Sequence, residues 1–260
     1  MSWLDLTDRT VLLTGAAGGI GRAIAAAFDA QGARLALFDR DTTGLEATSA
    51  LLADRHPAFT LDLAEGDRIA PAMEAASTAI GAPQILVNVA AMSVPRALAE
   101  VSEAEFARQI AVNTTAALLT GQAFLRLRDR DQPGAITNIS SIAATHSVPN
   151  GAGYSASKAA LTMLTRQLAV EWGPEGVRCN LVSPGLILTP LSQAFYADPA
   201  DRAAREAVVP ARRIGRPEDI ADAVLYLSSP RASYVSGADI VVDGGFTQTL
   251  MTHIPRKRMG

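Results

Sequence analysis

The amino-acid sequence predicts an α/β fold, in which one doubly wound parallel sheet of about seven strands carries helices on both faces. Short apolar runs alternate with longer helical stretches along the 260 residues, and this alternation is typical of such sheets. Most of the short runs are continuously apolar, as expected for parallel strands covered on both faces. Hydrophobic residues make up 48% and charged residues 19% of the chain, which allows a sizeable core and argues against disorder.

The expected strands are short apolar runs bounded by turn residues. In chain order they are Thr10–Thr14, Arg34–Asp39, Ala58–Asp62, Gln84–Val89, Gly134–Ile139, Val177–Val182 and Ala238–Val242. No internal repeat, low-complexity linker or break in composition divides the chain, so we expect a single domain over residues 1–260.

Four helical stretches are the clearest between these strands. The first covers residues 22–32 and ends on a glycine, a typical C-terminal stop. A long amphipathic stretch follows at 103–130, and another at 155–173. The last begins at Pro217 with two acidic residues in its first turn, which suits the positive end of the helix dipole.

Charge and hydropathy exclude several classes of protein. The formal net charge of −3 does not suggest the basic face that nucleic-acid binding needs. The apolar runs are interrupted before ~18 residues, so we expect no transmembrane helix, and the acidic N-terminal stretch does not resemble a secretion signal. The single cysteine, Cys179, excludes an intrachain disulfide and is expected to be a buried core thiol. A cytoplasmic protein without a metal site fits these features.

Residues 189–213 differ from the segments around them. They mix apolar side chains with charged ones, and Pro199 and Pro210 interrupt the stretch. One interpretation is a surface helical excursion, and the other is a mobile substrate lid over a pocket. We favour the lid because of its position relative to the motifs described below.

The first strand leads into a glycine-rich turn and a helix. Gly15, Gly19 and Gly21 have the spacing G-x-x-x-G-x-G, and the helix that begins near Ile20 directs its free N–H groups at the turn. This arrangement suits a pyrophosphate. The next strand ends on Asp39, 24 residues after the first glycine, where dinucleotide-binding folds place an acid that accepts hydrogen bonds from the adenosine ribose.

The acid at this position also predicts the cofactor. The Asp39 carboxylate would repel the 2′-phosphate of NADP and accept a hydrogen bond from the 2′-hydroxyl of NAD. Arg40 favours the opposite choice, because a guanidinium could bind that phosphate. The turn supplies no second basic residue, so we expect NAD. Asp62, which ends the third strand and precedes Leu63, is placed to accept a hydrogen bond from the adenine amine.

A tyrosine and a lysine share one helix face where the third helical stretch begins. Tyr154 and Lys158 are four residues apart. Only two of the 23 basic residues are lysines, and Lys257 lies in the C-terminal tail. An ammonium beside a phenol favours the phenolate, which predicts a lowered tyrosine pKa and proton exchange near neutral pH. The pair alone is common on surfaces, but Ser141 closes a strand 13 residues earlier, at the edge of the sheet where ligands bind.

With these motifs in order, the chain resembles the short-chain dehydrogenase/reductase family in its common single-domain form of ~250 residues, over nearly its whole length. The motifs are TGAAGGIG, Asp39, DL at 62–63, NVAA at 88–91, Asn113, NISS with Ser141, YSASK, SPGLILT at 183–189, GRPEDIA at 215–221 and VDGG at 242–245. The resemblance implies a Rossmann-like fold and an oxidoreductase that moves a hydride between NAD(H) and a secondary alcohol or ketone.

The resemblance also implies a role for each matching residue. Tyr154 would be the catalytic acid/base, Lys158 would bind the nicotinamide ribose and lower the tyrosine pKa, and Ser141 would hold the substrate oxygen. Asn113 would hold a water that completes the proton relay. The implied cofactor residues are Gly15, Gly19, Ile20, Gly21, Asp39, Arg40, Asp62, Leu63, Asn88, Ala90, Tyr154, Lys158, Pro184, Gly185, Ile187 and Thr189.

Position along the chain suggests the substrate residues. They are Ser141, Ala143, Asn150, Tyr154, Leu186, Leu191 and Phe195. The set is mostly apolar and contains no anion clamp, so we expect a neutral alcohol or ketone. Resemblance to family members also implies a homotetramer.

The fourth-strand motif departs from the family pattern. The family has Asn-Asn-Ala-Gly where this chain has Asn88, Val89, Ala90 and Ala91. The methyl added at Ala91 and the amide lost at Val89 predict altered local packing beside the cofactor, with activity kept because the four catalytic residues are intact.

Three alternatives compete with this function. An NADPH-dependent 3-oxoacyl-thioester (acyl carrier protein) reductase would need a basic cofactor pocket, and Asp39 argues against it. A non-catalytic dinucleotide sensor would often lack the tyrosine or the lysine, and both are present here. A sugar epimerase or dehydratase of the longer relatives would need a further C-terminal substrate domain.

Overall fold

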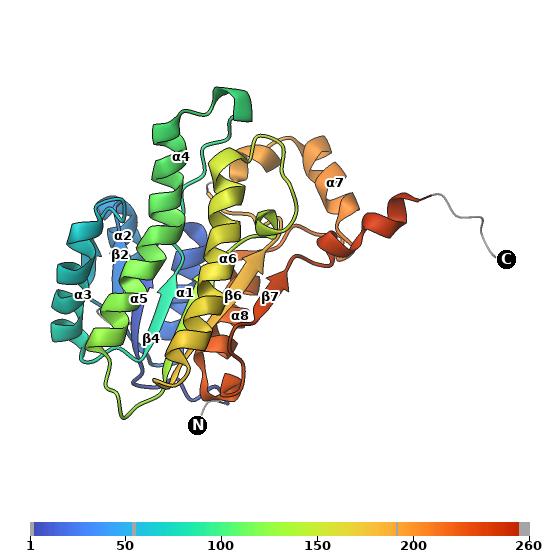
Figure 1. The fold of residues 1–260 in the computed structure, drawn as a ribbon. Helices are drawn as coiled ribbons and strands as arrows, with labels where there is room; N and C mark the ends of the chain where they lie inside the picture. Colours follow the sequence, from blue (N-terminus) through green and yellow to red (C-terminus); the bar gives the residue numbers. More distant parts are fainter. Residues whose placement is uncertain (1–2, 54–55, 191, 255–260) are drawn as a thin grey trace.

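The computed structural model describes residues 3–53, 56–190 and 192–254, which are built around one parallel sheet (Figure 1). Within the described residues, seven parallel strands lie in the order β3-β2-β1-β4-β5-β6-β7. They are β1 (Thr10–Thr14), β2 (Arg34–Asp39), β3 (Ala58–Thr60), β4 (Ile85–Asn88), β5 (Gly134–Ile139), β6 (Val177–Pro184) and β7 (Asp239–Val242). The predicted doubly wound parallel sheet is therefore confirmed.

Four strands differ from the sequence prediction at their ends: β4 is one residue shorter at each end, β7 begins one residue later, and β3 and β6 each change by two residues. β3 ends at Thr60, before the expected Asp62, because the Asp62 carboxylate accepts a hydrogen bond from the Ala64 backbone N–H at 2.9 Å and closes a turn. β6 continues to Pro184, two residues further than expected. On β6, Cys179 is completely buried, and burial raises the pKa of its thiol to about 12, which confirms the predicted core thiol.

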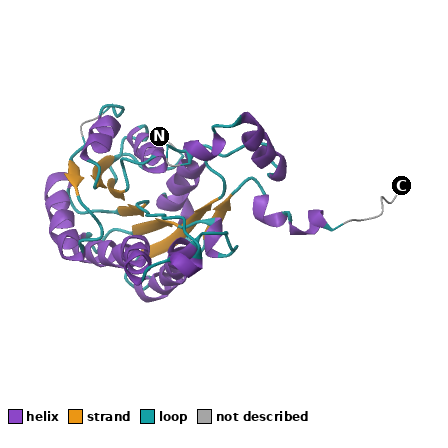
Figure 2. Cartoon of the chain, turned by 90° about the horizontal axis from the view of Figure 1, so that it is seen from above, coloured by secondary structure: helices purple, strands orange, loops and turns teal. Residues whose placement is uncertain are grey.

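Helices cover both faces of the sheet, as seen from above in Figure 2. The α-helices are α1 (Gly19–Asp29), α2 (Thr42–Ser49), α3 (Gly66–Ile80), α4 (Glu103–Ile110), α5 (Ala116–Leu127), α6 (Ala152–Trp172), α7 (Pro199–Val208) and α8 (Pro217–Ser228). The shorter turns are η1 (Leu98–Glu100), η2 (Ala111–Thr115), η3 (Ile142–Ala144), η4 (Gln193–Tyr196), η5 (Pro230–Ala232), η6 (Phe246–Gln248) and η7 (Leu250–His253).

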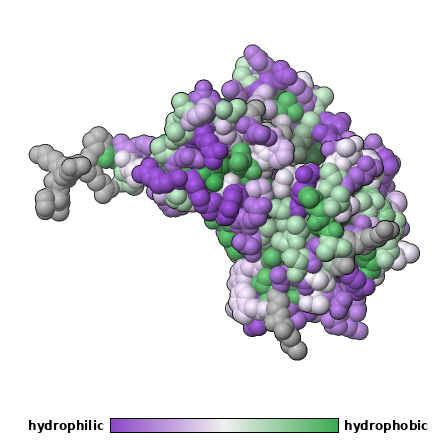
Figure 3. Space-filling view, turned by 180° about the vertical axis from the view of Figure 1, so that it is seen from behind, coloured by the Kyte–Doolittle hydropathy of each residue, from purple (hydrophilic) through white to green (hydrophobic). Residues whose placement is uncertain are grey.

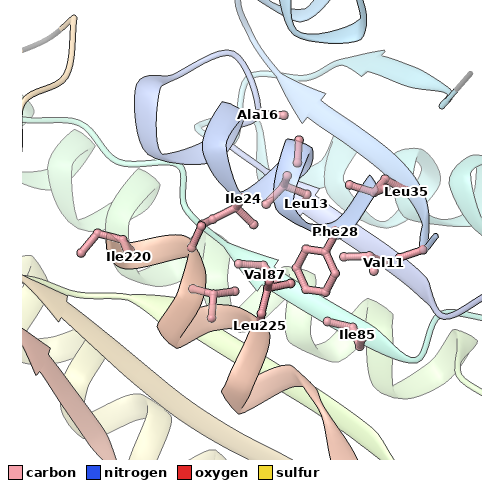
Figure 4. Close-up of a cluster of buried hydrophobic side chains, with 14 of the residues drawn as sticks. Val11, Leu13, Ala16, Ile24, Phe28, Leu35, Ile85, Val87, Ile220 and Leu225 are labelled. Carbon is pink, nitrogen blue, oxygen red and sulfur yellow. The ribbon is translucent and has the colours of Figure 1, made fainter. Parts of the chain in front are cut away.

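Two hydrophobic clusters hold the helices onto the sheet. In the first, Ile24 and Phe28 of α1 meet Val11 and Leu13 of β1 and Leu225 of α8 (Figure 4). The second cluster joins α3, α5 and α6 to the opposite face. Each fully buried side chain of this size contributes roughly 1.5–3 kcal/mol of transfer free energy, so the two clusters fix the helices that carry the site.

The strand order reverses beside β1, which pairs with β2 on one side and with β4 on the other. The connections that leave the carboxyl ends of β1 and β4 therefore diverge, and a crevice opens between them. This point of the sheet is where doubly wound folds bind their ligands.

The long helix predicted at 103–130 is divided by a π-helical turn. α4 ends at Ile110, η2 covers Ala111–Thr115, and α5 continues from Ala116. Asn113 lies within this turn and is buried. Single π-turns inside helices reposition the side chains around them, which explains why a regular helical periodicity did not reveal this break.

The chain leaves the body of the domain in two places. After β6, η4 and α7 lie beside the sheet, and no described residue of α7 is buried. η6 and η7 form an arm that projects from the body (Figures 1 and 2). From behind, hydrophilic and hydrophobic side chains are intermingled over the surface, and the arm again extends to one side (Figure 3).

Candidate active site

A cavity of about 550 Å³ lies at the carboxyl ends of the strands, at the point where the strand order reverses. It gathers most of the residues that the sequence predicted for cofactor and substrate. The predicted residues that line it are Gly15, Gly19, Ile20, Gly21, Asp39, Arg40, Asp62, Leu63, Ala90, Ser141, Tyr154, Lys158, Pro184, Gly185, Ile187, Thr189 and Phe195.

The glycine turn has no room for side chains at two of its positions. Gly15 has a φ of +71°, and a Cβ there would lie 2.5 Å from the backbone N of Ala90. A Cβ on Gly21 would lie 2.0 Å from the carbonyl oxygen of Gly15. No side chain caps the N-terminus of α1, so the N–H groups of its first turn stay free for an anion, such as a pyrophosphate.

The acid at the end of β2 is held in place by backbone amides. Asp39 Oδ2 accepts a hydrogen bond from the N–H of Ala17, and Oδ1 accepts one from the N–H of Asp41, both at 3.1 Å. Its neighbour Arg40 is exposed. Asp62 is already engaged, because Oδ2 pairs with an arginine of α4 at 3.2 Å. Both carboxylates retain lone pairs toward the cavity that they line.

Tyr154 and Lys158 come together from successive turns of α6. Lys158 is 1% exposed, and its Nζ donates a hydrogen bond to the Ile139 carbonyl at 2.7 Å. Nζ also lies 5.8 Å from the centre of the Tyr154 ring. Burial lowers the pKa of Lys158 to about 7, so this base exchanges protons near neutral pH.

The pKa of Tyr154 moves in the opposite direction from the one expected. Burial raises the pKa of the phenol above its ordinary value, and a hydrogen bond with Ser141 opposes that rise. The expected lowering assumed a fully charged ammonium next to the phenol. Since burial also lowers the pKa of Lys158, that charge is weakened and desolvation dominates.

Ser141 and Asn113 take different positions around this pair. Ser141 lines the cavity, and its Oγ accepts a hydrogen bond from the Ala143 N–H at 3.1 Å. Asn113 Oδ1 accepts from the Met92 N–H at 2.7 Å, while Nδ2 donates to the Met92 carbonyl and to Ser157 Oγ, both at 2.8 Å. Asn113 therefore ties the π-turn to the end of β4 and to α6.

Comparison with known proteins agrees with this geometry. A family model described as enoyl-(acyl carrier protein) reductase matches residues 15–247. D-threitol dehydrogenase of Mycolicibacterium smegmatis is 36% identical over 245 residues, which are 93% of this chain and 94% of that protein. The structure of a putative short-chain alcohol dehydrogenase from Sinorhizobium meliloti has a TM-score of 0.89 at 33% identity, over 95% of this chain and 99% of that one.

This chain belongs to the short-chain dehydrogenase/reductase family.

Members of this family are oxidoreductases that use NAD(P), and the protein is therefore an oxidoreductase of this type. One similar structure, a putative 2-deoxy-D-gluconate 3-dehydrogenase from Agrobacterium tumefaciens, holds bound NADP. It has a TM-score of 0.86 at 32% identity, and the match covers 95% of this chain and all of that one. Among the described residues, no helix is long and apolar enough to cross a membrane.

One residue of the family motif lies below the cavity and does not line it. Asn88 Nδ2 donates to Asn138 Oδ1, and Asn88 Oδ1 accepts from Thr120 Oγ1, both at 2.9 Å. Asn138 in turn donates to Thr165 at 2.8 Å. The Asn88 side chain is thus committed to a buried network that joins β4, β5, α5 and α6, because a buried amide must satisfy its hydrogen bonds.

Three expected substrate residues also lie outside the lining. Ala143 belongs to η3 and is buried. Asn150 is exposed with a φ of +59°, and its carbonyl accepts from the N–H of Arg96. It therefore serves a left-handed turn that asparagine tolerates. Leu186 lines a separate small cavity behind the site, and Leu191 lies outside the described residues.

Sequence reasoning missed Ser192, which lines the cavity. Its Oγ donates to the Ile187 carbonyl at 2.7 Å and accepts from the Thr189 N–H at 2.9 Å. A threonine followed three residues later by a serine is a turn signature, so the T-x-x-S spacing was an available signal. The departures Val89 and Ala91 both line the cavity.

A second cavity of about 490 Å³ lies at the amino ends of β4, β5 and β6, away from these residues. Its partly buried Arg178 donates to the carbonyls of Ser229 and Val235 at 3.2 and 3.3 Å. The C-terminal ends of α6 and α8 also line it. The guanidinium of Arg178 is thus committed to backbone carbonyls, as basic side chains near helix C-termini often are.

Proposed function

We propose that this protein is an NAD-dependent dehydrogenase that oxidises a neutral secondary alcohol, or reduces the matching ketone. The observation that carries the proposal is that Ser141, Tyr154, Lys158 and Asp39 line one cavity at the switch point of the sheet. Ser141, Tyr154 and Lys158 would bind the alcohol oxygen and transfer its proton. Asp39 would select the cofactor.

In the proposed reaction, Tyr154 exchanges one proton with the substrate oxygen. NAD⁺, when bound, accepts the hydride from the carbinol carbon. The phenolate form of Tyr154 takes the hydroxyl proton during oxidation, and the phenol returns it during reduction. The Ser141 hydroxyl donates a hydrogen bond to the substrate oxygen and stabilises the charge that develops there.

Lys158 and Asn113 complete the proposed relay. A lysine with a pKa of about 7 receives and releases protons at neutral pH, so it can restore the protonation state of the tyrosine. Both amide protons of Asn113 are already donated to Met92 and Ser157. A relay water would therefore have to donate its hydrogen bond to an oxygen of Asn113, either Oδ1 or the backbone carbonyl.

The choice of NAD over NADP follows from Asp39. Two backbone amides hold its carboxylate where a 2′-phosphate would meet a negative charge. Arg40 is the adjacent cation that would favour NADP, and one similar structure, of a putative 2-deoxy-D-gluconate 3-dehydrogenase, holds bound NADP. The competing function is an NADPH-dependent 3-oxoacyl-thioester reductase, which a higher kcat/KM with NADPH than with NADH would favour.

The lining of the cavity supports an uncharged substrate. Its ionisable residues are Asp39, Arg40, Asp62, Tyr154 and Lys158. The first three lie at the ends of β2 and β3, and the buried ammonium of Lys158 is bound to a backbone carbonyl. The remaining side chains are small, apolar or hydroxylic, so no described lining group is left to clamp an anion beside Ser141.

The substrate is to be found by a screen, and the mechanism is to be tested by one substitution. NAD⁺ reduction is measured over secondary alcohols, polyols and hydroxysteroids. Tyr154→Phe is expected to lower kcat by at least ~10²-fold while NADH binding, followed by fluorescence, is retained. Tyr234→Phe is the matched control, because that tyrosine is fully exposed and does not line the cavity. Full activity of Tyr154→Phe would refute the mechanism.

The homotetramer and the cytoplasmic location expected from the sequence both stay predictions. Apolar side chains exposed on α6 support the assembly, since Met163 is 60% and Val170 is 77% exposed. Light scattering on the purified protein measures the oligomeric state directly, and a monomer at micromolar concentration would contradict the tetramer.

A further inference from the structure

Two neighbouring aromatic residues of the segment after β6 have opposite environments. Phe195 is 54% exposed and lines the active-site cavity. Tyr196 follows it on η4 and is buried. Burial raises the pKa of the Tyr196 phenol, and the nearby charge of Arg205 opposes this rise. The chain therefore presents one ring to the cavity and packs the next one inward.

Arg205 on α7 contacts both rings. Its guanidinium carbon lies 5.5 Å from the ring centroid of Phe195 and 5.5 Å from that of Tyr196. These distances are within the range of a cation–π interaction. One planar cation thus bridges two successive aromatic side chains, which restricts the rotation of the exposed one.

The other contacts of α7 do not hold the aromatic pair. Arg202, one turn earlier, pairs with Glu206 at 2.9 Å on the exposed surface. Asp198 caps the helix by accepting from the N–H groups of Ala200 and Asp201. Within the described part of the chain no carboxylate pairs with Arg205, and α7 has no buried residue. The guanidinium of Arg205 therefore links α7 to Phe195 in the wall of the cavity.

We propose that Arg205 is a positioning residue that holds Phe195 against the substrate, and so sets a preference for alcohols that present an apolar ring. This rests on the proposed function, because it concerns the substrate wall of the same cavity. The rival role for a cation near the cavity is direct binding of a substrate carboxylate, and the two roles predict different kinetics.

The test compares Arg205→Met with Arg202→Met. Both variants lose a charge from α7, but only the first loses the contact with the rings. Cyclohexanol, 2-propanol and 4-hydroxycyclohexanecarboxylate are the substrates. Arg205→Met is expected to raise KM for cyclohexanol about three- to tenfold, with kcat, the KM for 2-propanol and the Kd for NADH nearly unchanged. Arg202→Met is expected to leave all four at wild-type values.

A double variant separates positioning from an independent effect. If Arg205 acts through the ring, Phe195→Ala combined with Arg205→Met raises the cyclohexanol KM no further than Phe195→Ala alone. Additive effects would overturn the proposal. A loss confined to the carboxylated alcohol would also overturn it, because that result identifies Arg205 as an anion receptor.

Proteolysis gives a readout that does not depend on turnover. Chymotrypsin cleavage after Phe195 and Tyr196 is expected to be several-fold faster in Arg205→Met than in Arg202→Met or the wild type, because the rings lose their anchor. Equal cleavage rates would refute the positioning role. If the wild-type enzyme oxidises no alcohol with NAD⁺, but Arg205→Met is still cleaved faster than the wild type, the proposed function is refuted. The positioning of the rings by Arg205 then still stands.

Discussion

Replacing Lys158 by methionine is expected to stabilise the fold at neutral pH and to abolish turnover. The side chain is 1% exposed, and its Nζ has one hydrogen bond, to the Ile139 carbonyl. Burial lowers the pKa from 10.5 to about 7. Between these two values the unfolded chain binds more protons than the folded one, so the free energy of unfolding rises with pH.

The magnitude follows from this fall of the pKa from 10.5 to about 7. At 1.36 kcal/mol per unit, the buried lysine costs about 5 kcal/mol well below pH 7 and about 4 kcal/mol at pH 7. Methionine removes this cost, but it leaves the Ile139 carbonyl without its partner, which costs about 1 kcal/mol. The net expectation is a stabilisation of about 3 kcal/mol at pH 7.

Urea unfolding at pH 7, 8 and 9 is the assay. The wild type is expected to gain about 2 kcal/mol across this interval from Lys158, and Lys158→Met is expected to lack that gain. The interval stops at pH 9 because the thiol of Cys179, whose ordinary pKa is 9.0, is half ionised there in the unfolded chain, whereas burial raises its pKa to about 12 in the folded protein.

Arg166→Met is the matched control, since it removes a charge from the exposed face of the same helix. It should keep the pH dependence of the wild type. The reasoning is refuted if Lys158→Met destabilises the protein at pH 7, or if it retains the wild-type rise between pH 7 and 9. A variant that is more stable but inactive would show that the lysine is kept for chemistry at the expense of stability.

Three further predictions concern the cofactor, the glycine turn and the tyrosine. Asp39→Ser is expected to lower the ratio of kcat/KM with NADH to kcat/KM with NADPH at least ~10-fold. An unchanged ratio would show that the Asp39 carboxylate does not select the cofactor. Gly21→Ala is expected to lose at least ~2 kcal/mol of unfolding free energy, because the new Cβ would lie 2.0 Å from the Gly15 carbonyl oxygen. Gly18→Ala, whose nearest contact would be 3.5 Å, should be close to neutral in the same urea titrations. Burial raises the pKa of Tyr154, so the rate of alcohol oxidation should increase as the pH rises above neutrality. The rate of ketone reduction should fall above the pKa of Tyr154. If the rates of both directions change with pH in the same way, this reasoning is contradicted.

Features that depend on neighbours in the chain could be predicted from the sequence. The order of the strands along the chain, the glycine turn and the acid at the end of β2 follow from local patterns, because apolar runs and turn residues act over a few positions. The four-residue spacing of Tyr154 and Lys158 placed both on one helix face, and both line the cavity.

Features that depend on what packs around a side chain required the folded protein. Asn88 belongs to a family motif, yet its amide meets Asn138 from another strand and turns into the core. The pKa of Tyr154 moves upward because the degree of burial, which no spacing reveals, outweighs its partners. Arg205 meets two rings nine and ten residues earlier in the chain because a capped turn folds α7 back over η4. Desolvation and long-range contact are properties of the assembled fold, and for that reason the sequence could name these residues without assigning their environments.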